Sequence, residues 1–488
     1  MDKEIVANLY HSWEGFLKYR KTTIKERADL LRQIAKEIDL LGEILIQTAA
    51  EETNLTVARL NNEKNRTIFQ LNSYADATES CQWMNLSIDL GDKDRNPPKL
   101  DLRKTMEPLG PVLVFGASNF PFAYSTAGGD TASAFAAGCS VIVKAHPAHP
   151  KTSDLVAQAI WKALEKCNLD KNIFQHIYCD DFQQIEEIVQ YNYIKAVGFT
   201  GSLKGGKAIF DYANKRKEPI PVFAEMGSTN PVFIFENYLK NHSAQLASQL
   251  ADSITLGMGQ FCTKPGLVFI QNSENCDLFI QKLADNIDQI IPANLLHSGI
   301  YKNYLENSAL HIHQPNVAVL TANKNPTEAL QVKPTIITCD AFTFIGNPVL
   351  HEEVFGPMAL VIKYDNERQL KHLIESIQGQ LTCSVFAENE DIQANNIAID
   401  SLKMICGRLN FNTVPTGVEV CLSMQHGGPY PATTDSRFTS VGADAIKRFA
   451  RPLTYQNAQN HFLPDELKNE NPFGVWRTIN NQLTNSKI

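Results

Sequence analysis

The chain has 488 residues, more than one ordinary domain needs and enough for two or three. Its hydrophobic content of 43% and charged content of 20% are normal for a globular protein, and a formal net charge of −8 argues against nucleic acid or an anionic membrane as a partner. The sequence contains no long apolar run that could span a membrane, and its first residues lack the pattern of a signal peptide. We therefore expect a cytoplasmic protein whose ten scattered cysteines are reduced thiols.

The first eighty residues are expected to be helical. Thr23 and Glu26 have the spacing of a capping box, in which each residue satisfies a free N–H of the other. Apolar residues then recur at the spacing of one helical face, namely at Ala28, Leu31, Ile34, Ile38, Leu41 and Leu45. This pattern predicts a helix that serves packing.

Residues 86–108 change character. Leu86–Leu90 and Leu100–Met106 alternate like strands, and turn-forming residues lie between them. The pattern predicts a hairpin outside the helical region, with free edges that invite pairing with another subunit.

Between Gly110 and Phe235, short apolar strands alternate with helices, which is typical of a parallel sheet covered on both faces. The expected strands are Val112–Phe115, Val141–Lys144, Ala196–Phe199, Val222–Ala224 and Val232–Phe235. The expected helices lie near Thr126–Ala137, Ser153–Lys166, Asp181–Gln190 and Gly205–Lys215. A second alternating region extends to about Gln425, and the polar final dozen residues are expected to be a frayed tail.

Two residues stand out for chemistry. Glu225 follows an expected strand, and Cys262 lies in a glycine-rich turn after a helix-like run, Ser243–Leu256. A thiolate can attack a carbonyl carbon, and a carboxylate can later activate a water molecule. Asn119 follows the strand Val112–Phe115, where its amide could stabilise an oxyanion.

Other strand ends carry weaker signals. The glycine-rich turn Phe199–Gly206 could face a phosphate, although the GxGxxG fingerprint is absent. Lys144 could reach a ribose or a phosphate. His146 and His149 lie beside prolines in a loop, which is weak evidence for a metal, and we predict no metal site.

Taken together, these motifs resemble the NAD(P)-dependent aldehyde dehydrogenase superfamily over about Gly110 to Val441. The motifs, in the order of that family, are Ser-Asn119-Phe-Pro, Val-Lys144, Phe-Thr-Gly201-Ser, Glu225-Met-Gly, Gly-Gln-Phe-Cys262 and Glu353-Val-Phe355-Gly-Pro. Within the superfamily the chain is most similar to 2-oxoglutarate-semialdehyde (2,5-dioxopentanoate) dehydrogenases. The segments that carry this closer match are Lys144–Pro150, Ala224–Pro231 and His426–Arg437. A branch that resembles NADP-dependent fatty-aldehyde dehydrogenases shares much of the pattern.

The resemblance implies that Cys262 is the nucleophile, that Asn119 and the Cys262 N–H hold the oxyanion, and that Glu225 activates water. The aldehyde would become a carboxylic acid through a cysteine thioester, with hydride transfer to NAD(P). The expected substrate is 2-oxoglutarate semialdehyde, and the alternative is a long-chain or other aliphatic aldehyde. The residues implied in cofactor binding are Lys144, Gly201, Ser202, Glu353 and Phe355. His426 is a secondary candidate for the active site.

The implied fold is α/β, with two doubly wound domains plus a small bridging and oligomerisation element. The cofactor-binding domain would comprise residues 1–86 and 109–224, and the catalytic domain residues 225–425. The bridging element would comprise residues 87–108 and 451–460, followed by a C-terminal tail at 461–488. A homodimer or homotetramer is expected.

The cofactor and the substrate remain open at this stage. NAD-preferring family members often carry a glutamate where this chain has Pro147, so NADP is slightly favoured over NAD. Transfer of the acyl group to coenzyme A is one competing hypothesis, and a non-catalytic descendant is another. Glu225 argues against the first, because a deacylating base is needed for water and not for a thiol. The cations available to bind an acidic substrate are Arg437, Lys264 and Arg408.

Overall fold

The computed structural model describes residues 1–322, 325 and 327–488. The chain opens with the helices α1 (Lys3–Tyr19), α2 (Ile24–Leu40), α3 (Gly42–Thr53) and α4 (Val57–Ser80). The expected capping box is present, since Glu26 Oε2 accepts from the Thr23 N–H at 2.7 Å. The predicted apolar face is buried in the core except at Leu41, which is half-buried, because the helix ends at Leu40 and a new one begins at Gly42.

The first large sheet is parallel and has the strand order β5-β4-β3-β6-β7. Its strands are β3 (Val112–Phe115), β4 (Val141–Lys144), β5 (Phe174–Ile177), β6 (Ala196–Thr200) and β7 (Val222–Glu225). Its helices are α5 (Gly129–Ala137), α6 (Pro150–Lys166), α7 (Phe182–Val189) and α8 (Leu203–Asn214). Separate apolar clusters cover its two faces, as the sequence pattern predicted. The pattern missed β5, in which Gln175 and His176 interrupt the apolar run.

The second large sheet has the order β11-β13-β14-β9-β8-β15-β16 and is parallel except for β11. Its strands are β8 (Val232–Ile234), β9 (Leu267–Gln271), β11 (Ala318–Val319), β13 (Thr335–Asp340), β14 (Met358–Tyr364), β15 (Gln380–Phe386) and β16 (Cys406–Phe411). A short ladder pairs β10 (Ala293–Asn294) with β12 (Gln331–Val332). The sequence pattern placed Val232–Phe235 in the first sheet, and this expectation is wrong. The chain crosses to the second sheet after β7, and β8 lies between β9 and β15.

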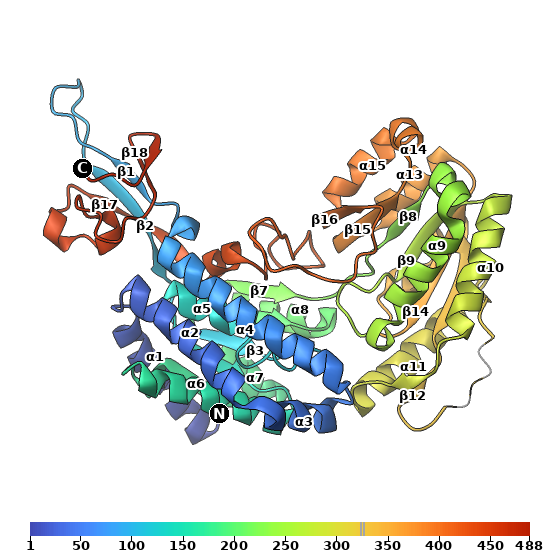
Figure 1. Ribbon diagram of the computed structural model, residues 1–488, viewed down its shortest axis with the longest axis horizontal. Helices are drawn as coiled ribbons and strands as arrows, with labels where there is room; N and C mark the ends of the chain where they lie inside the picture. Colours follow the sequence, from blue (N-terminus) through green and yellow to red (C-terminus); the bar gives the residue numbers. More distant parts are fainter. Residues whose placement is uncertain (323–324, 326) are drawn as a thin grey trace.

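Helices pack on both faces of this second sheet. One face is covered by α9 (Glu236–Thr255) and α10 (Glu274–Asp288). The other is covered by α11 (Ser298–Ile312), α12 (Ala341–Gly346), α13 (Glu367–Ser376) and α15 (Asn396–Ser401), and the short helix α14 (Asn389–Ala394) packs against α9. The two large sheets and their helices form separate bodies along the long axis of the molecule (Figure 1).

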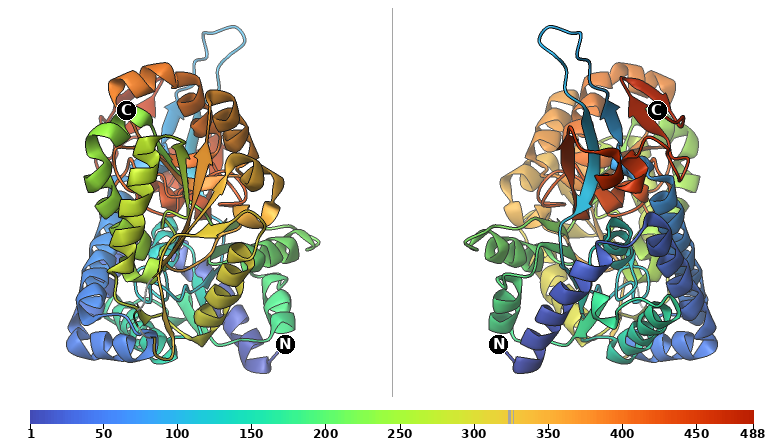
Figure 2. Two further views of the ribbon diagram at one scale, coloured as in Figure 1. Left: turned by 90° about the vertical axis from the view of Figure 1, so that its right-hand side faces the viewer. Right: turned by 90° about the vertical axis from the view of Figure 1, so that its left-hand side faces the viewer.

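A small sheet of order β17-β2-β1-β18-β19 stands beside the first body, and the loop between β1 and β2 projects from the molecule (Figure 2). Its strands are β1 (Ser87–Asp89), β2 (Leu102–Pro108), β17 (Ala450–Gln456), β18 (Arg477–Ile479) and β19 (Gln482–Thr484). The predicted hairpin is β1–β2, which pair antiparallel.

The expectation of a frayed final dozen residues is wrong. β18 and β19 complete the small sheet, and Arg477, only 1% exposed, donates to the backbone carbonyls of Lys468 and Ser486. The sequence pattern missed this order because the segment is held by polar hydrogen bonds, which do not produce a hydrophobic periodicity. All ten cysteines are free thiols, and no helix of the described residues is long and apolar enough to cross a membrane.

Candidate active site

Glu225 lies at the carboxyl end of β7, beside the glycine-rich turn after β6. The register pairs Thr200 with Glu225, and the Gly201 N–H donates to the Glu225 carbonyl at 3.0 Å. From Glu225 the chain runs through Asn230 into β8 of the second sheet. The carboxylate therefore stands where the chain passes from one large sheet to the other.

The loop that carries Cys262 has an unusual backbone. After α9 ends at Thr255, Gly257, Met258 and Gly259 have φ angles of +53°, +54° and +67°. A Cβ at Gly259 would lie 2.3 Å from the Gly356 carbonyl oxygen, so only glycine allows this close approach. The Asn230 amide donates to the Cys262 carbonyl at 2.8 Å. These contacts hold the cysteine loop against two of the motifs found in the sequence.

Cys262, His426 and Glu225 form one contiguous cluster. His426 Nε2 lies 3.6 Å from Cys262 Sγ and 3.2 Å from Glu225 Oε2. The His426 and Glu225 side chains are only 1% and 5% exposed. Ser440 Oγ donates to Glu225 Oε2 at 3.1 Å. The structure thus brings the secondary candidate of the sequence, His426, between the two primary ones.

The charges in this cluster are unevenly distributed. Burial and the nearby Glu225 charge raise the pKa of the Cys262 thiol well above its ordinary value. Burial by itself would raise the pKa of Glu225, but His426 and hydrogen bonds from Ser440 and Cys262 outweigh it and lower that pKa. Near neutral pH the resting cluster therefore has a protonated thiol and an ionised carboxylate, with an imidazole within reach of both.

Asn119 lies against the cysteine loop. Its side-chain amide donates to the Gln260 carbonyl at 3.2 Å, two residues before Cys262, and its own carbonyl accepts from Arg59 Nη2 at 2.7 Å. This places the Asn119 amide against the loop that carries Cys262.

Helix α4 holds the segment on which Asn119 lies. The Arg59 guanidinium stands over the rings of Phe120 and Phe261, 5.1 and 4.6 Å from their centroids. Glu63 Oε1 accepts from the backbone N–H groups of Phe122 and Ala123 at 2.8 and 3.0 Å. Sequence reasoning missed these α4 residues because lone charged side chains on a helix carry no motif.

Two arginines from different parts of the chain approach Tyr124 and Cys262. Arg66 on α4 donates from Nη2 to the Tyr124 hydroxyl at 3.3 Å. Arg408 on β16 is held by the carbonyls of Pro415 and Gly417. Each guanidinium group lies close enough to favour a negative charge on Cys262 or Tyr124, and each has a buried Nε–H without a partner among the described residues.

The other cations considered from the sequence lie elsewhere. The Arg437 side chain is 80% exposed and pairs with Asp435 at 2.5 Å. Lys264 is buried and donates to the carbonyls of Val354 and Met358 at 3.1 and 2.7 Å. Neither arrangement directs a free cation at Cys262.

The candidate cofactor residues occupy the ends of β4 and β6. Lys144 is the last residue of β4, and its Nζ lies 3.2 Å from Asp180 Oδ1. Ser202 caps α8 by accepting from the Gly205 N–H at 3.2 Å, and both Gly201 and Ser202 are exposed. The strands β4 and β6 flank β3, and the exposed N-terminus of α8 fits a phosphate of a dinucleotide.

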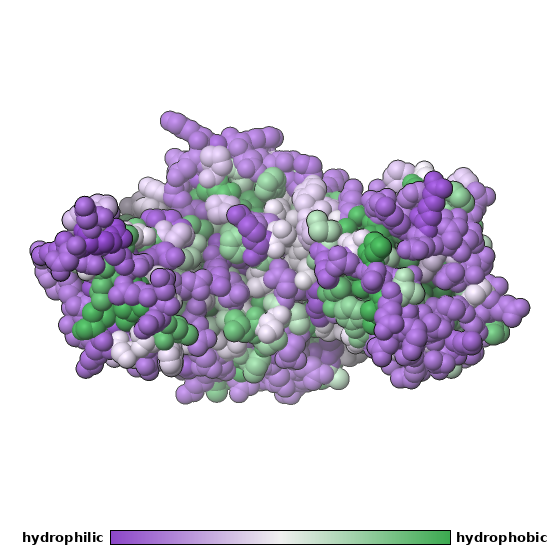
Figure 3. All heavy atoms as spheres, turned by 90° about the horizontal axis from the view of Figure 1, so that it is seen from above, coloured by the Kyte–Doolittle hydropathy of each residue, from purple (hydrophilic) through white to green (hydrophobic). Residues whose placement is uncertain are grey.

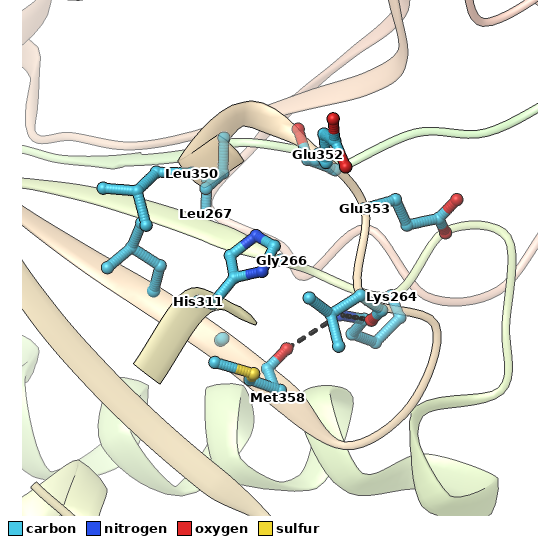
Figure 4. Close-up of a pocket in the computed structure, with 12 residues that line it drawn as sticks. Lys264, Gly266, Leu267, His311, Leu350, Glu352, Glu353 and Met358 are labelled. Atoms are coloured by element: carbon cyan, nitrogen blue, oxygen red, sulfur yellow. Dashed lines mark hydrogen bonds between the residues drawn. The ribbon is translucent and has the colours of Figure 1, made fainter. Parts of the chain in front are cut away.

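Glu353 and Phe355 come from the second body. Glu353 lines a small pocket together with Lys264 and His311, and its carboxylate points away from His311 (Figure 4). Burial raises the pKa of Glu353 to about 7 and lowers that of the neighbouring Lys264 to about 8. Phe355 is half-buried next to Gly356, which contacts the cysteine loop at Gly259.

His146 and His149 have a structural explanation. Their rings stack with centroids 5.5 Å apart, and His149 Nε2 lies 2.9 Å from the Ala117 carbonyl oxygen. This contact ties the loop after β4 to the loop after β3.

The fold and this cluster define an α/β enzyme equipped for cysteine-dependent carbonyl chemistry. The model of the aldehyde dehydrogenase family matches residues 2–449. The chain belongs to the aldehyde dehydrogenase family and is an NAD(P)-dependent enzyme.

Curated relatives agree with this assignment, and a solved structure agrees with the fold. The chain is 42% identical over 475 residues to alpha-ketoglutaric semialdehyde dehydrogenase of Acinetobacter baylyi, covering 97% of this chain and 90% of the relative. It is 40% identical to alpha-ketoglutaric semialdehyde dehydrogenase 2 of Azospirillum brasilense, covering 95% and 89%. The structure of succinic semialdehyde dehydrogenase from Streptococcus pyogenes in complex with NADP⁺ has a TM-score of 0.77 at 17% identity, covering 93% and 95%.

Proposed function

We propose that this protein oxidises 2-oxoglutarate semialdehyde to 2-oxoglutarate through a thioester on Cys262. The names of the two relatives above 39% identity support this substrate. The observation that carries the proposal is the pair Arg66 and Arg408, which lie near Cys262 with unsatisfied Nε–H donors.

The arginine pair discriminates between the two candidate substrates. The far end of 2-oxoglutarate semialdehyde is a carboxylate, which can accept charge-assisted hydrogen bonds from guanidinium groups. A long-chain aldehyde has only methylene groups to offer, and it would leave these donors buried without partners. The geometry therefore favours the acidic substrate over the aliphatic alternative.

The chemistry would begin at the thiol. His426 Nε2 is the base within reach of the Cys262 proton, and the imidazolium that forms is stabilised by Glu225. The thiolate attacks the aldehyde carbon, and Asn119 donates to the resulting oxyanion, together with the Cys262 N–H. NAD(P), when bound, supplies the acceptor for the hydride that leaves this carbon. A thioester remains on Cys262, Glu225 takes a proton from water, and hydrolysis releases the acid and restores the thiolate.

Substitution of Arg66 by methionine tests the substrate assignment. The loss of one hydrogen bond to a charged group, about 1.5–3 kcal/mol, should lower kcat/KM for 2-oxoglutarate semialdehyde roughly 10- to 150-fold. Activity toward pentanal, a neutral aldehyde of similar length, should stay the same or rise. Reduced-nicotinamide absorbance gives both rates, and Cys262→Ala provides the inactive reference.

Arg437→Met is the matched control, because Arg437 is exposed and pairs with Asp435. It should leave both rates unchanged. Equal losses for the acidic and the neutral aldehyde in Arg66→Met would contradict carboxylate binding. A strong wild-type preference for a long-chain aldehyde would replace the proposed substrate by the aliphatic alternative.

For the cofactor, we propose that Lys144, Gly201, Ser202, Glu353 and Phe355 bind NADP or NAD. Pro147 removes one carboxylate that would repel a 2′-phosphate, and Lys144 supplies a cation. Asp180, however, lies 3.2 Å from Lys144 and would compete with a phosphate for it. Both cofactors are therefore compatible with this site, and Asp180 opposes the NADP preference inferred from Pro147 and Lys144.

The substitution Asp180→Asn is expected to shift the enzyme toward NADP. The pair is exposed on the aspartate side, so its interaction with Lys144 contributes about 0.2–1 kcal/mol, and the ratio of kcat/KM for NADP to that for NAD should rise by up to about fivefold. Initial rates with each cofactor at saturating aldehyde measure the ratio. Asp435→Asn serves as the control. An unchanged or lower ratio in Asp180→Asn would exclude Asp180 from the cofactor site.

We also propose that two or four copies assemble through the small sheet. Its surroundings carry exposed apolar side chains, among them Phe462, Trp476 and Leu483, which are 73%, 50% and 69% exposed. Figure 3 has apolar surface at its left end, the end at which the small sheet stands in Figure 1. The outer strand β19 offers an unpaired edge in the described chain.

A further inference from the structure

The cluster of Cys262, His426 and Glu225 has the composition of a zinc site. Thiolate sulfur, imidazole nitrogen and carboxylate oxygen are the ligands that Zn²⁺ takes in proteins. Within the described part of the chain, this is the group of three such residues whose ligand atoms lie close enough to share one ion, all within 4.8 Å of one another.

The distances also fit a tetrahedral ion. With bonds of about 2.3 Å to sulfur and about 2.1 Å to nitrogen and oxygen, tetrahedral angles separate sulfur from nitrogen by about 3.6 Å and nitrogen from oxygen by about 3.4 Å. The observed Sγ–Nε2 and Nε2–Oε2 distances are 3.6 and 3.2 Å. The remaining sulfur–oxygen pair must close to about 3.6 Å from no more than 4.8 Å.

A second observation points to a cation. The Glu225 side chain is 5% exposed, and its Oε1 has no hydrogen-bond partner among the described residues, whereas Oε2 is the oxygen that lies 3.2 Å from His426 Nε2 and accepts from Ser440. A buried carboxylate oxygen without a donor is costly, and a divalent cation would satisfy it. The remaining tetrahedral position would be left to a water molecule, as in sites with three protein ligands.

We propose that Zn²⁺ binds reversibly to Cys262 Sγ, His426 Nε2 and Glu225 and thereby inhibits the enzyme. The inference concerns regulation of the site described under the proposed function and rests on it for its effect on turnover. On binding, the thiol proton leaves to solvent and a zinc–sulfur bond replaces it. The sulfur lone pair, the imidazole nitrogen and the carboxylate are then all occupied, so neither attack on an aldehyde nor activation of water is possible.

Cobalt substitution tests the site without relying on catalysis. Co²⁺ bound to one thiolate in a tetrahedral site gives visible d–d bands and a sulfur-to-cobalt charge-transfer band. We expect one equivalent of Co²⁺ to produce these bands in the full-length protein and Zn²⁺ to displace it. Cys262→Ser should abolish the charge-transfer band. His426→Gln should weaken Zn²⁺ binding by more than about 100-fold, since even second-shell losses cost roughly 10- to 100-fold.

The control is Cys421→Ser, because Cys421 is an exposed thiol that could bind metal adventitiously. It should leave the spectrum and the Zn²⁺ affinity unchanged. Zn²⁺ should also protect Cys262 from alkylation by iodoacetamide, as peptide mass spectrometry would show, and a chelator should restore reactivity. Bands that survive Cys262→Ser, or that disappear in Cys421→Ser, would overturn the proposal.

The outcomes separate this inference from the proposed function. If 2-oxoglutarate semialdehyde is not the substrate, the cobalt spectrum and the alkylation result are unaffected. If the enzyme oxidises that substrate but shows no thiolate band and no protection by Zn²⁺, the metal site is wrong and the reaction stands.

Discussion

Replacement of Glu225 by glutamine is expected to allow one burst of NAD(P)H per active site and then to stop turnover. Thiol attack and hydride loss use Cys262 and His426 directly, and Glu225 only stabilises the imidazolium, so the thioester still forms, at a lower rate than in the wild type. Its hydrolysis needs the carboxylate to take a proton from water, and loss of a general base costs about 10²–10⁴ in rate. Stopped-flow absorbance would resolve the burst, and intact-protein mass spectrometry would detect the acyl group on Cys262.

Cys262→Ala should show no burst and no acyl adduct, which establishes that the burst comes from the thioester. The same experiment tests transfer to coenzyme A. If coenzyme A restored full turnover to Glu225→Gln and accelerated the wild type, the acceptor would be a thiol and the hydrolytic assignment would be wrong. Absence of any burst in the wild type with all aldehydes would support a non-catalytic descendant.

The substitution His426→Gln is expected to lower kcat/KM near pH 7 by about 10²–10⁴ and to move the acidic limb of its pH profile to higher pH. Burial and Glu225 raise the pKa of the Cys262 thiol, so the thiol holds its proton at neutral pH unless a base removes it. Without the imidazole, the thiolate forms only as the pH rises toward that raised pKa. The pH dependence of kcat/KM and of iodoacetamide alkylation would both report the shift.

His242→Gln is a matched control, since His242 Nε2 lies 2.9 Å from Glu388, a histidine–glutamate pair outside the cluster. It should leave the profile unchanged. A His426→Gln enzyme that lost thermal stability but kept the wild-type pH profile would assign His426 a structural role in its glycine-rich loop.

Much of the architecture was readable from local patterns. Strands such as Val112–Phe115 and Val141–Lys144 are short, continuous apolar runs, because both faces of a parallel sheet are buried. The capping box at Thr23 is likewise a local signal, since both partners lie in one helical turn. The ordered motifs also indicated the family, which the match over residues 2–449 confirmed.

The sequence also singled out Cys262 and Glu225, because each lies next to a feature with its own pattern, a glycine-rich turn and a strand end. The short distance between Cys262 and His426 could not be predicted from the sequence. His426 is 164 residues from Cys262 along the chain, and a distance of 3.6 Å between their side chains exists only after the loops pack. The spacing of motifs along the chain does not reveal a contact between segments this far apart.

Three-dimensional packing alone decided the polar surroundings of the site. Arg66 lies on a helix with no distinguishing motif, and Arg408 lies in a strand from the other body, yet both approach Tyr124. Two of the cations that the sequence suggested for substrate binding have other surroundings. Arg437 is exposed to solvent, and Lys264 donates to backbone carbonyls. Charged side chains have no periodic signature, because their partners are chosen by geometry across the chain.

The same distinction explains the end of the chain and the cofactor site. β18 and β19 are held by Arg477 hydrogen bonds to backbone carbonyls, which hydropathy does not record. Pro147 suggested a cofactor site without a carboxylate. The loop after β5, however, places Asp180 next to Lys144, which is 36 residues away in the sequence. The sequence by itself determined most of the strands and the family and pointed to Cys262 and Glu225 as the candidate reacting pair, because these depend on local patterns. The tertiary structure decided which charged side chains lie around the candidate active site and the candidate cofactor site, because those contacts join segments that are distant in sequence.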